Sequence, residues 1–142
     1  MNYLMLISHG GLAEGLKSTL AMFAGDKVNQ VLAFGLKEGQ SVDAFAEEVR
    51  ASLERLDDAE FILLADIVGG SPLATTCNVL AELGKLEGTR ILGGMNLTMA
   101  LTTAVMMDTL DGEALVATVL SEATTALQEF KVASSDDEDD DI

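Results

Sequence analysis

The sequence predicts an α/β domain: a doubly wound, mostly parallel sheet of four to five strands with helices on both faces. Short apolar runs alternate with segments of helical periodicity about every thirty residues, which is typical of strand–helix–strand units. The apolar runs are nearly continuous, as expected for parallel strands that are buried on both faces. Both observations favour a parallel sheet over an antiparallel one.

Strands and helices are expected to alternate along most of the chain. The apolar runs that predict strands are residues 3–7, 28–34, 61–65 and 89–92. Apolar residues recur at helical spacing in residues 12–23, 42–56, 72–80, 97–105 and 115–130. Residues 35–40 are predicted to be a polar loop. Residues 129–133 are open to two interpretations, a fifth strand or the frayed end of the last helix.

Polar residues mark the starts of three helices. Ser41 and Asn96 can each cap a helix, and Ser71 is a third expected cap, with Pro72 at the first helical position. The three glycine-rich turns, residues 9–11, 69–71 and 93–96, each follow a predicted strand. In a parallel sheet such turns meet at one edge, and ligands bind there at the point where the strand order reverses.

Composition limits the domain organisation and the class of partner. The chain has 142 residues with 24 acidic and 8 basic side chains, giving a net charge of -16. We expect one domain over residues 1–133 and a disordered acidic tail over residues 134–142, because a run of like charges does not pack. The basic residues are dispersed singly, so neither nucleic acid nor an anionic membrane surface is expected as a partner.

Cysteine usage and hydropathy bear on location. The single cysteine, Cys77, excludes an internal disulfide and is compatible with a reducing compartment. Residues 91–107 carry no charge, but glycine, asparagine and threonine interrupt them, so membrane insertion is not expected. Residues 1–7 lack the basic leader of a secretory signal. The expected location is the cytoplasm.

His9 and Asp66 are the predicted catalytic pair. His9, the only histidine in the chain, ends the first strand, and Asp66 follows the third. A neutral imidazole nitrogen can act as a nucleophile, and the partner of its other nitrogen sets the tautomer. A carboxylate that accepts one ring proton leaves the lone pair of the other nitrogen free. The alternatives are that His9 is an ordinary turn residue and that Asp66 only caps a loop.

If His9 attacks phosphorus, the glycine-rich turns at the same edge of the sheet could bind the phosphoryl group. The amides of Gly10, Gly11, Gly70 and Ser71, with the Ser71 hydroxyl, could hold phosphoryl oxygens at helix N-termini. A serine triad is disfavoured because Gly-Gly-Ser-Pro is not a nucleophile elbow. One histidine and one aspartate make an incomplete metal shell, and no Walker lysine motif is present, so no metal or cofactor is expected. The glycines and serine could equally form a plain turn and cap.

Three motifs together resemble the IIA component of the mannose-type bacterial sugar phosphotransferase system (PTS). They are Ser8-His9-Gly10, Asp66-Ile67-Val68-Gly69-Gly70-Ser71-Pro72 and Gly94-Met95-Asn96, and the likeness spans about residues 1 to 130. The resemblance implies a phosphotransferase with a phosphohistidine intermediate. It would accept phosphate on Nε2 of His9 from the protein HPr, with Asp66 on the other ring nitrogen, and pass it to a IIB component for sugar uptake. Position 98 departs from the family, which often has proline where this chain has Thr98.

The resemblance also bears on assembly and partners. It implies a homodimer that exchanges a short C-terminal strand, for which residues 129–133 are the matching stretch. Because the chain is so acidic, the cation that steadies the phosphoryl group is expected to come from the partner, which would dock on Leu12, Ile67 and Met95. Two alternatives remain: the related phosphotransfer subunit of a PTS-dependent dihydroxyacetone kinase, and a non-catalytic anion-binding or sensor module.

Overall fold

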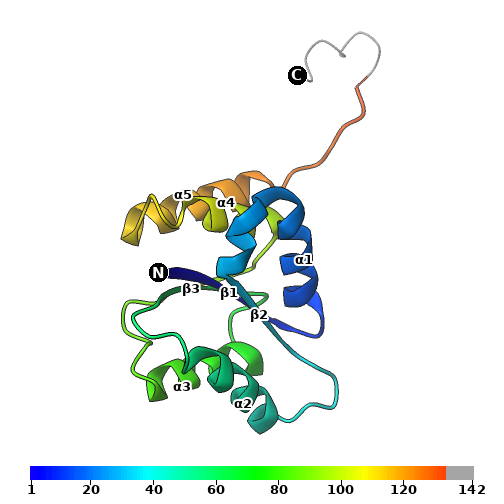
Figure 1. Ribbon diagram of the computed structural model, residues 1–142. Helices are drawn as coiled ribbons and strands as arrows, with labels where there is room; N and C mark the ends of the chain where they lie inside the picture. The colour runs from blue at the N-terminus through cyan, green and yellow to red at the C-terminus, as the bar shows by residue number, and fades with distance from the viewer. Residues whose placement is uncertain (134–142) are drawn as a thin grey trace.

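The computed structural model describes residues 1–133, which form a four-stranded, all-parallel sheet between two layers of helices (Figure 1). The strands are β1 (Asn2–His9), β2 (Val31–Leu36), β3 (Glu60–Ala65) and β4 (Arg90–Gly93). The helices are α1 (Leu12–Ala24), the 3-10 helix η1 (Gly25–Gln30), α2 (Val42–Leu53), α3 (Ser71–Glu82), α4 (Leu97–Met106) and α5 (Gly112–Thr125). The predicted doubly wound α/β fold is confirmed. The predicted acidic tail, residues 134–142, lies outside the described residues.

The strand order places a reversal between the two central strands. The order across the sheet is β2-β1-β3-β4, so the chain winds from β1 to one side and then returns past it to the other. His9 ends β1, and Asp66 directly follows β3. In open parallel sheets, the crevice at such a reversal, outside the carboxyl ends of the strands, is where ligands bind. The topology therefore puts both residues at that crevice.

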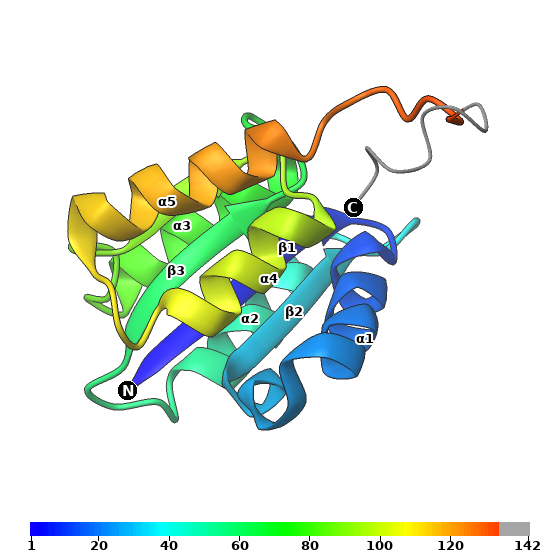
Figure 2. The same ribbon diagram turned by 90° about the horizontal axis from the view of Figure 1, so that it is seen from above.

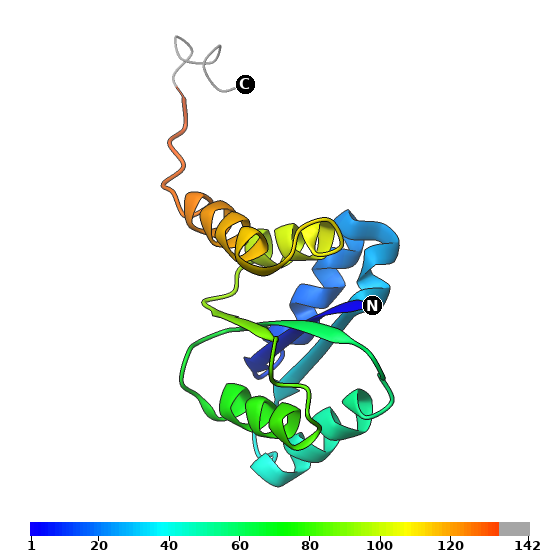
Figure 3. The same ribbon diagram turned by 90° about the vertical axis from the view of Figure 1, so that its left-hand side faces the viewer.

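Side chains of the central strands alternate between the two helical layers. Leu4 and Leu6 of β1 pack in the core with α1, α4 and α5, whereas Met5 and Ile7 pack in the core with α2 and α3. All four side chains are fully buried. Figure 2 shows α4 and α5 lying over the sheet, and Figure 3 shows the two helical layers with the sheet between them. Burial on both faces explains the continuous apolar runs, and each such side chain contributes about 1.5–3 kcal/mol to folding.

The second strand differs from its prediction at both ends. Residues 25–30 form η1, so β2 begins at Val31, and Val28 instead packs against the core beneath α1. At the other end, Gly35 and Leu36 belong to β2 and pair with Ser8 and His9. The predicted polar loop therefore begins two residues later, and β2 runs alongside the whole carboxyl end of β1.

Two of the three predicted helix caps are confirmed. The N–H of Ala44 donates to Ser41 Oγ at 3.0 Å, and the N–H of Met99 donates to Asn96 Oδ1 at 2.8 Å. The prediction for Ser71 is wrong, because α3 already begins at Ser71 and Gly70 holds the cap position. Pro72 follows in the first turn, where a missing N–H is tolerated.

The last helix ends at Thr125, and residues 127–133 form neither helix nor strand. Leu127, Phe130 and Val132 are between 74% and 86% exposed. Among the described strands, β4 pairs with β3 alone, so its other edge is open. No helix within residues 1–133 combines the length and apolar character needed to cross a membrane.

Candidate active site

The two predicted catalytic side chains are in contact. His9 Nδ1 lies 2.9 Å from Asp66 Oδ2. The same carboxylate oxygen accepts the backbone N–H of His9, also at 2.9 Å. Because an ionised carboxylate only accepts hydrogen bonds, Nδ1 carries a proton, and in the neutral imidazole Nε2 therefore keeps its lone pair. The arrangement presents Nε2 as the reactive nitrogen.

Asp66 is held as an anion by its surroundings. Its side chain is only 14% exposed, and this burial by itself would raise the pKa of the carboxyl group. Hydrogen bonds from the His9 backbone, the His9 ring and the Ile67 N–H outweigh burial, so the pKa of Asp66 lies below its ordinary value. The Ile67 N–H donates to Oδ1 at 2.8 Å. Both carboxylate oxygens are therefore fixed, which leaves the imidazole ring little freedom to rotate.

The His9 ring is about half exposed, and its Nε2 side lies beside Gly70. The His9 side chain is 48% exposed, and Nε2 makes no hydrogen bond within the described part of the chain. A Cβ built at Gly70 would lie 2.9 Å from His9 Cε1 and 3.3 Å from Nε2. Only glycine leaves this space clear. An incoming group can thus approach Nε2 beside the start of α3.

Three of the four amides predicted to hold phosphate are available. The N–H groups of Gly11, Gly70 and Ser71 stand at or just before the first residues of α1 and α3, and none donates a hydrogen bond within residues 1–133. Unpaired amides at helix N-termini favour anions. The prediction for the Gly10 amide is wrong, because it donates to the Leu36 carbonyl at 2.8 Å.

Ser8, which was not among the predicted site residues, shapes the turn after His9. Ser8 is fully buried, and its Oγ accepts the N–H of Ala13, in the first turn of α1, at 2.8 Å. Gly10 has φ +59°, a left-handed conformation that glycine adopts without strain. The signal available in the sequence was a polar residue at the end of an apolar run. Ser8 and Gly10 together fix how the chain passes from β1 into α1.

The predicted docking residues do not all reach the surface. Leu12 and Ile67 are each 52% exposed and flank the histidine turn and the Asp66 loop. Met95 is only 8% exposed and belongs to the core beneath α4 and α5. Its N–H donates to the Ala65 carbonyl, which continues the β3–β4 pairing and turns the side chain inward. The prediction that Met95 forms part of a docking patch is therefore wrong.

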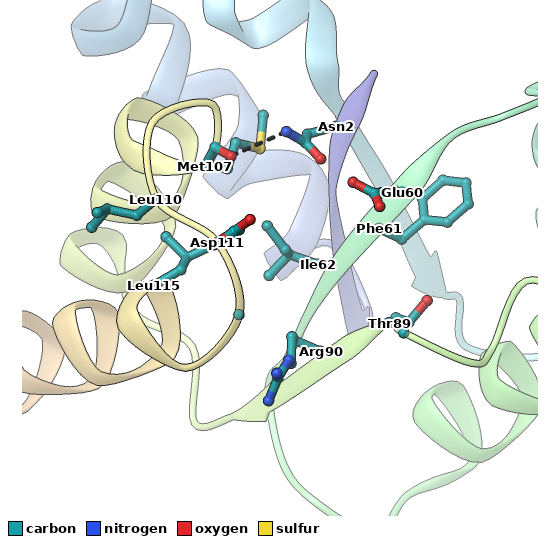
Figure 4. Close-up of a pocket in the computed structure, with 12 residues that line it drawn as sticks. Asn2, Glu60, Phe61, Ile62, Thr89, Arg90, Met107, Leu110, Asp111 and Leu115 are labelled. Carbon is teal, nitrogen blue, oxygen red and sulfur yellow. Dashed lines mark hydrogen bonds between the residues drawn. The ribbon is translucent and has the colours of Figure 1, made fainter.

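A cavity of about 580 Å³ lies at the amino-terminal ends of the strands, opposite the ends that carry His9 and Asp66 (Figure 4). Its lining includes Asn2 at the start of β1, Glu60 at the start of β3, Arg90 in β4 and Asp111 before α5. Because β1 runs its full length between Asn2 and His9, the cavity is roughly 20 Å from the imidazole. Among residues 1–133, no group of three or more acidic, histidine or cysteine side chains is arranged to hold a metal ion. The histidine site is an exposed edge rather than an enclosed pocket.

Comparison with known proteins gives a family match and a set of similar folds. A family model described as the PTS system fructose IIA component matches residues 3–120. The mannose/sorbose specific IIA subunit from Enterococcus faecalis is 24% identical, with 94% of this chain and 97% of that chain covered, at a TM-score of 0.75. The phosphotransferase system component EIIA from Streptococcus agalactiae is also 24% identical, with 92% and 98% covered, at a TM-score of 0.73.

A third structure has the same architecture. It is the PTS IIA protein associated with the fucose utilization operon from Streptococcus pneumoniae, 24% identical over 90% of this chain and 92% of that chain, at a TM-score of 0.70. At this level of identity the three structures establish the shared fold. No curated protein sequence matches the chain.

Proposed function

Because the chain belongs to the mannose/fructose-type IIA family of the sugar phosphotransferase system, we propose that it carries a phosphoryl group on His9 between two other proteins. The donor is phospho-HPr, and the acceptor is a IIB component that phosphorylates the transported sugar. The observation that carries this proposal is the His9–Asp66 contact, with Nδ1 2.9 Å from the carboxylate and the His9 side chain 48% exposed. Both partners belong to the cytoplasm, which is where we place this protein.

In the transfer step, the Nε2 lone pair of His9 forms a bond to phosphorus as the bond from phosphorus to the donor nitrogen breaks. A donor ring that is protonated on its other nitrogen leaves as neutral imidazole. The positive charge then appears on the His9 ring, where the Asp66 carboxylate stabilises it through Nδ1. Passage to the IIB component runs the same step in reverse, with His9 as the leaving group.

The surroundings of Nε2 suit a transferring phosphoryl group. Catalysis of such transfers depends mainly on positioning and on stabilising charge on the phosphoryl oxygens. The amides of Gly11, Gly70 and Ser71 and the Ser71 hydroxyl are donors at the starts of two helices whose dipoles favour an anion. With a net charge of -16, the chain leaves the neutralising cation to its partner.

The open edge around His9 supports a protein donor over a small molecule. Small-molecule sites usually enclose most of their ligand, whereas His9 lies on an exposed edge and the 580 Å³ cavity is elsewhere. Leu12, three residues after His9, and Ile67, directly after Asp66, provide exposed apolar surface. We place the docking patch there.

A homodimer is part of the proposal. Residues 129–133, with Phe130 and Val132 exposed by 84% and 86%, lie outside the sheet, while one edge of β4 pairs with no strand of residues 1–133. An extended apolar segment and an open strand edge are complementary. We propose that this segment adds to β4 of a second copy, as the family likeness implies.

The test is incubation of the protein with phosphoenolpyruvate, enzyme I and HPr, followed by intact mass measurement. We expect one acid-labile, base-stable phosphate on the wild type and none on His9→Ala. Adding a IIB component should discharge the phosphate. Discharge only by a dihydroxyacetone kinase would assign the chain to that related system. No phosphate at all would favour a non-catalytic anion-binding module and overturn the proposal.

A further inference from the structure

Each outer strand, β2 and β4, has a glycine paired with the residue that precedes His9 or Asp66 in the neighbouring central strand. Gly35 of β2 pairs with Ser8, which precedes His9, and Gly93 of β4 pairs with Ala65, which precedes Asp66. We propose that these two glycines are positioning residues that set the contact between His9 and Asp66. The inference rests on the proposed function and adds residues to its site that neither touch the imidazole nor bind phosphate.

Gly35 leaves room for the turn that follows His9. A Cβ built on Gly35 would lie 2.0 Å from the Gly10 carbonyl oxygen and 3.2 Å from its carbon. On the same side, the Gly10 N–H donates to the Leu36 carbonyl at 2.8 Å, so the turn is drawn tightly against β2. A methyl group at position 35 would have to push this backbone away. Because His9 and Gly11 flank Gly10, the nucleophile and a phosphate-binding amide would move with it.

Gly93 leaves room for the loop that follows Asp66. A Cβ built there would lie 2.2 Å from Val68 Cγ2 and 3.5 Å from Val68 Cβ. Val68 is two residues after Asp66, and the intervening Ile67 donates its N–H to Asp66 Oδ1. The backbone N of Val68 also lies 3.5 Å from that Cβ, and a shift of the Val68 backbone away from the added methyl would move the Ile67 N–H that holds the carboxylate. Gly35 acts on the histidine side of the contact, and Gly93 acts on the aspartate side.

Space, and not backbone conformation, requires glycine at both positions. Neither Gly35 nor Gly93 has a φ in the left-handed region, in contrast to Gly10 and Gly69. Alanine can adopt an extended strand conformation without strain. A change in the His9–Asp66 contact caused by alanine at position 35 or 93 would therefore come from the added methyl group meeting Gly10 or Val68, and not from backbone strain.

The two glycines differ in what they accommodate, and this difference makes the proposal testable. The neighbour of Gly35 is a backbone carbonyl, which no side-chain change can remove. The neighbour of Gly93 is a methyl group of Val68, which Val68→Ala deletes. Gly93→Ala should therefore be rescued by Val68→Ala. The comparison is the double variant against Val68→Ala alone, as in a double-mutant cycle.

The experiment measures the His9–Asp66 contact directly in the unphosphorylated protein. The ¹⁵N spectrum of the His9 ring should show a protonated Nδ1 and an unprotonated Nε2 in the wild type. In Gly35→Ala and Gly93→Ala we expect this tautomer signature and the hydrogen-bonded Nδ1–H signal to weaken. Phosphorylation by phospho-HPr should slow about 10- to 100-fold, the usual effect of misplacing reacting groups by about 1 Å. Gly15→Ala, in α1 with nothing within 4 Å of the added methyl, is the matched control and should leave both readouts unchanged.

The outcomes separate the inference from the proposed function. Wild-type ring signals and rates in Gly35→Ala and Gly93→Ala would overturn the inference, and so would failure of Val68→Ala to restore the ring signature of Gly93→Ala. If Gly35→Ala does not fold, the Gly93 rescue decides the matter. If the wild type itself takes no phosphate, the proposed function fails, while the ring spectra still test whether the two glycines position His9 against Asp66.

Discussion

Asp66 Oδ2 accepts both N–H groups of His9, the backbone amide and the ring Nδ1–H, each at 2.9 Å. One oxygen thereby fixes the strand end that carries the histidine and the tautomer of its ring. The other oxygen is held by the Ile67 amide, so neither side chain moves independently of the sheet. The pairing of β1 with β3 brings His9 and Asp66 together, and their contact sets the direction in which Nε2 points.

Replacing this carboxylate should slow phosphoryl transfer. Asp66→Asn keeps the shape of the side chain but loses its charge, and a hydrogen bond to a charged group contributes about 1.5–3 kcal/mol. We expect phosphorylation of His9 by phospho-HPr to slow roughly 10- to 150-fold. Asp108→Asn is the control, because that carboxylate pairs with Lys27 and Asn2 at the far edge of the sheet. Equal rates for wild type and Asp66→Asn would contradict the role of the carboxylate.

A methyl group at Gly70 should block the approach to Nε2. The Cβ of Gly70→Ala would lie 2.9 Å from His9 Cε1, closer than real Cβ atoms come, and the ring cannot retreat while Asp66 holds Nδ1. We expect phosphorylation to slow about 10-fold or more. Rapid-quench measurement of phosphate uptake checks this. Wild-type uptake by Gly70→Ala would show that phosphate enters from another side.

The low pKa of Asp66 predicts a pH-dependent contribution to stability. Since the folded-state pKa lies below the ordinary value of 3.8, ionised Asp66 stabilises the fold at pH values above 3.8. That contribution is lost as the pH falls through the folded-state pKa. Urea unfolding of wild type and Asp66→Asn should therefore give a difference in unfolding free energy that is constant above about pH 5 and shrinks below pH 3.8. A difference that stays constant to the lowest pH at which both fold would refute this assignment.

The exposed and buried members of the predicted docking patch should behave differently. Leu12→Ala and Ile67→Ala remove exposed apolar surface, and each should raise the KM for phospho-HPr about 5-fold or more without lowering stability. Met95→Ala should instead destabilise the protein by about 2–5 kcal/mol, because it empties a buried position. Steady-state kinetics and urea unfolding check both effects. Unchanged kinetics for Leu12→Ala and Ile67→Ala would reject the patch.

The fold and the central contact were predictable for the same physical reason. Strands buried on both faces must be apolar along their whole length, so they stand out in the sequence, and parallel strands end at one edge. His9 and Asp66 each follow such a run. That His9 and Asp66 lie close together could therefore be predicted without knowing how side chains pack.

What the sequence did not reveal depended on contacts between distant segments. The partner of the Gly10 amide is Leu36, which falls in the predicted polar loop of residues 35–40, although β2 continues through Leu36. Met95 lies in a glycine-rich turn that looks exposed, yet its bond to Ala65 directs the side chain into the core. The close approaches of Gly35 and Gly93 are likewise tertiary features that local sequence patterns do not encode.

The most direct test of this account is ¹⁵N and ³¹P NMR of the ¹⁵N-labelled protein after phosphorylation by phosphoenolpyruvate, enzyme I and HPr. We predict one phosphorus signal coupled to Nε2 of His9, with Nδ1 still protonated and hydrogen-bonded to Asp66. Phosphorus coupled to Nδ1, or bound to any residue other than His9, would contradict the assignment of Nε2 as the nucleophile.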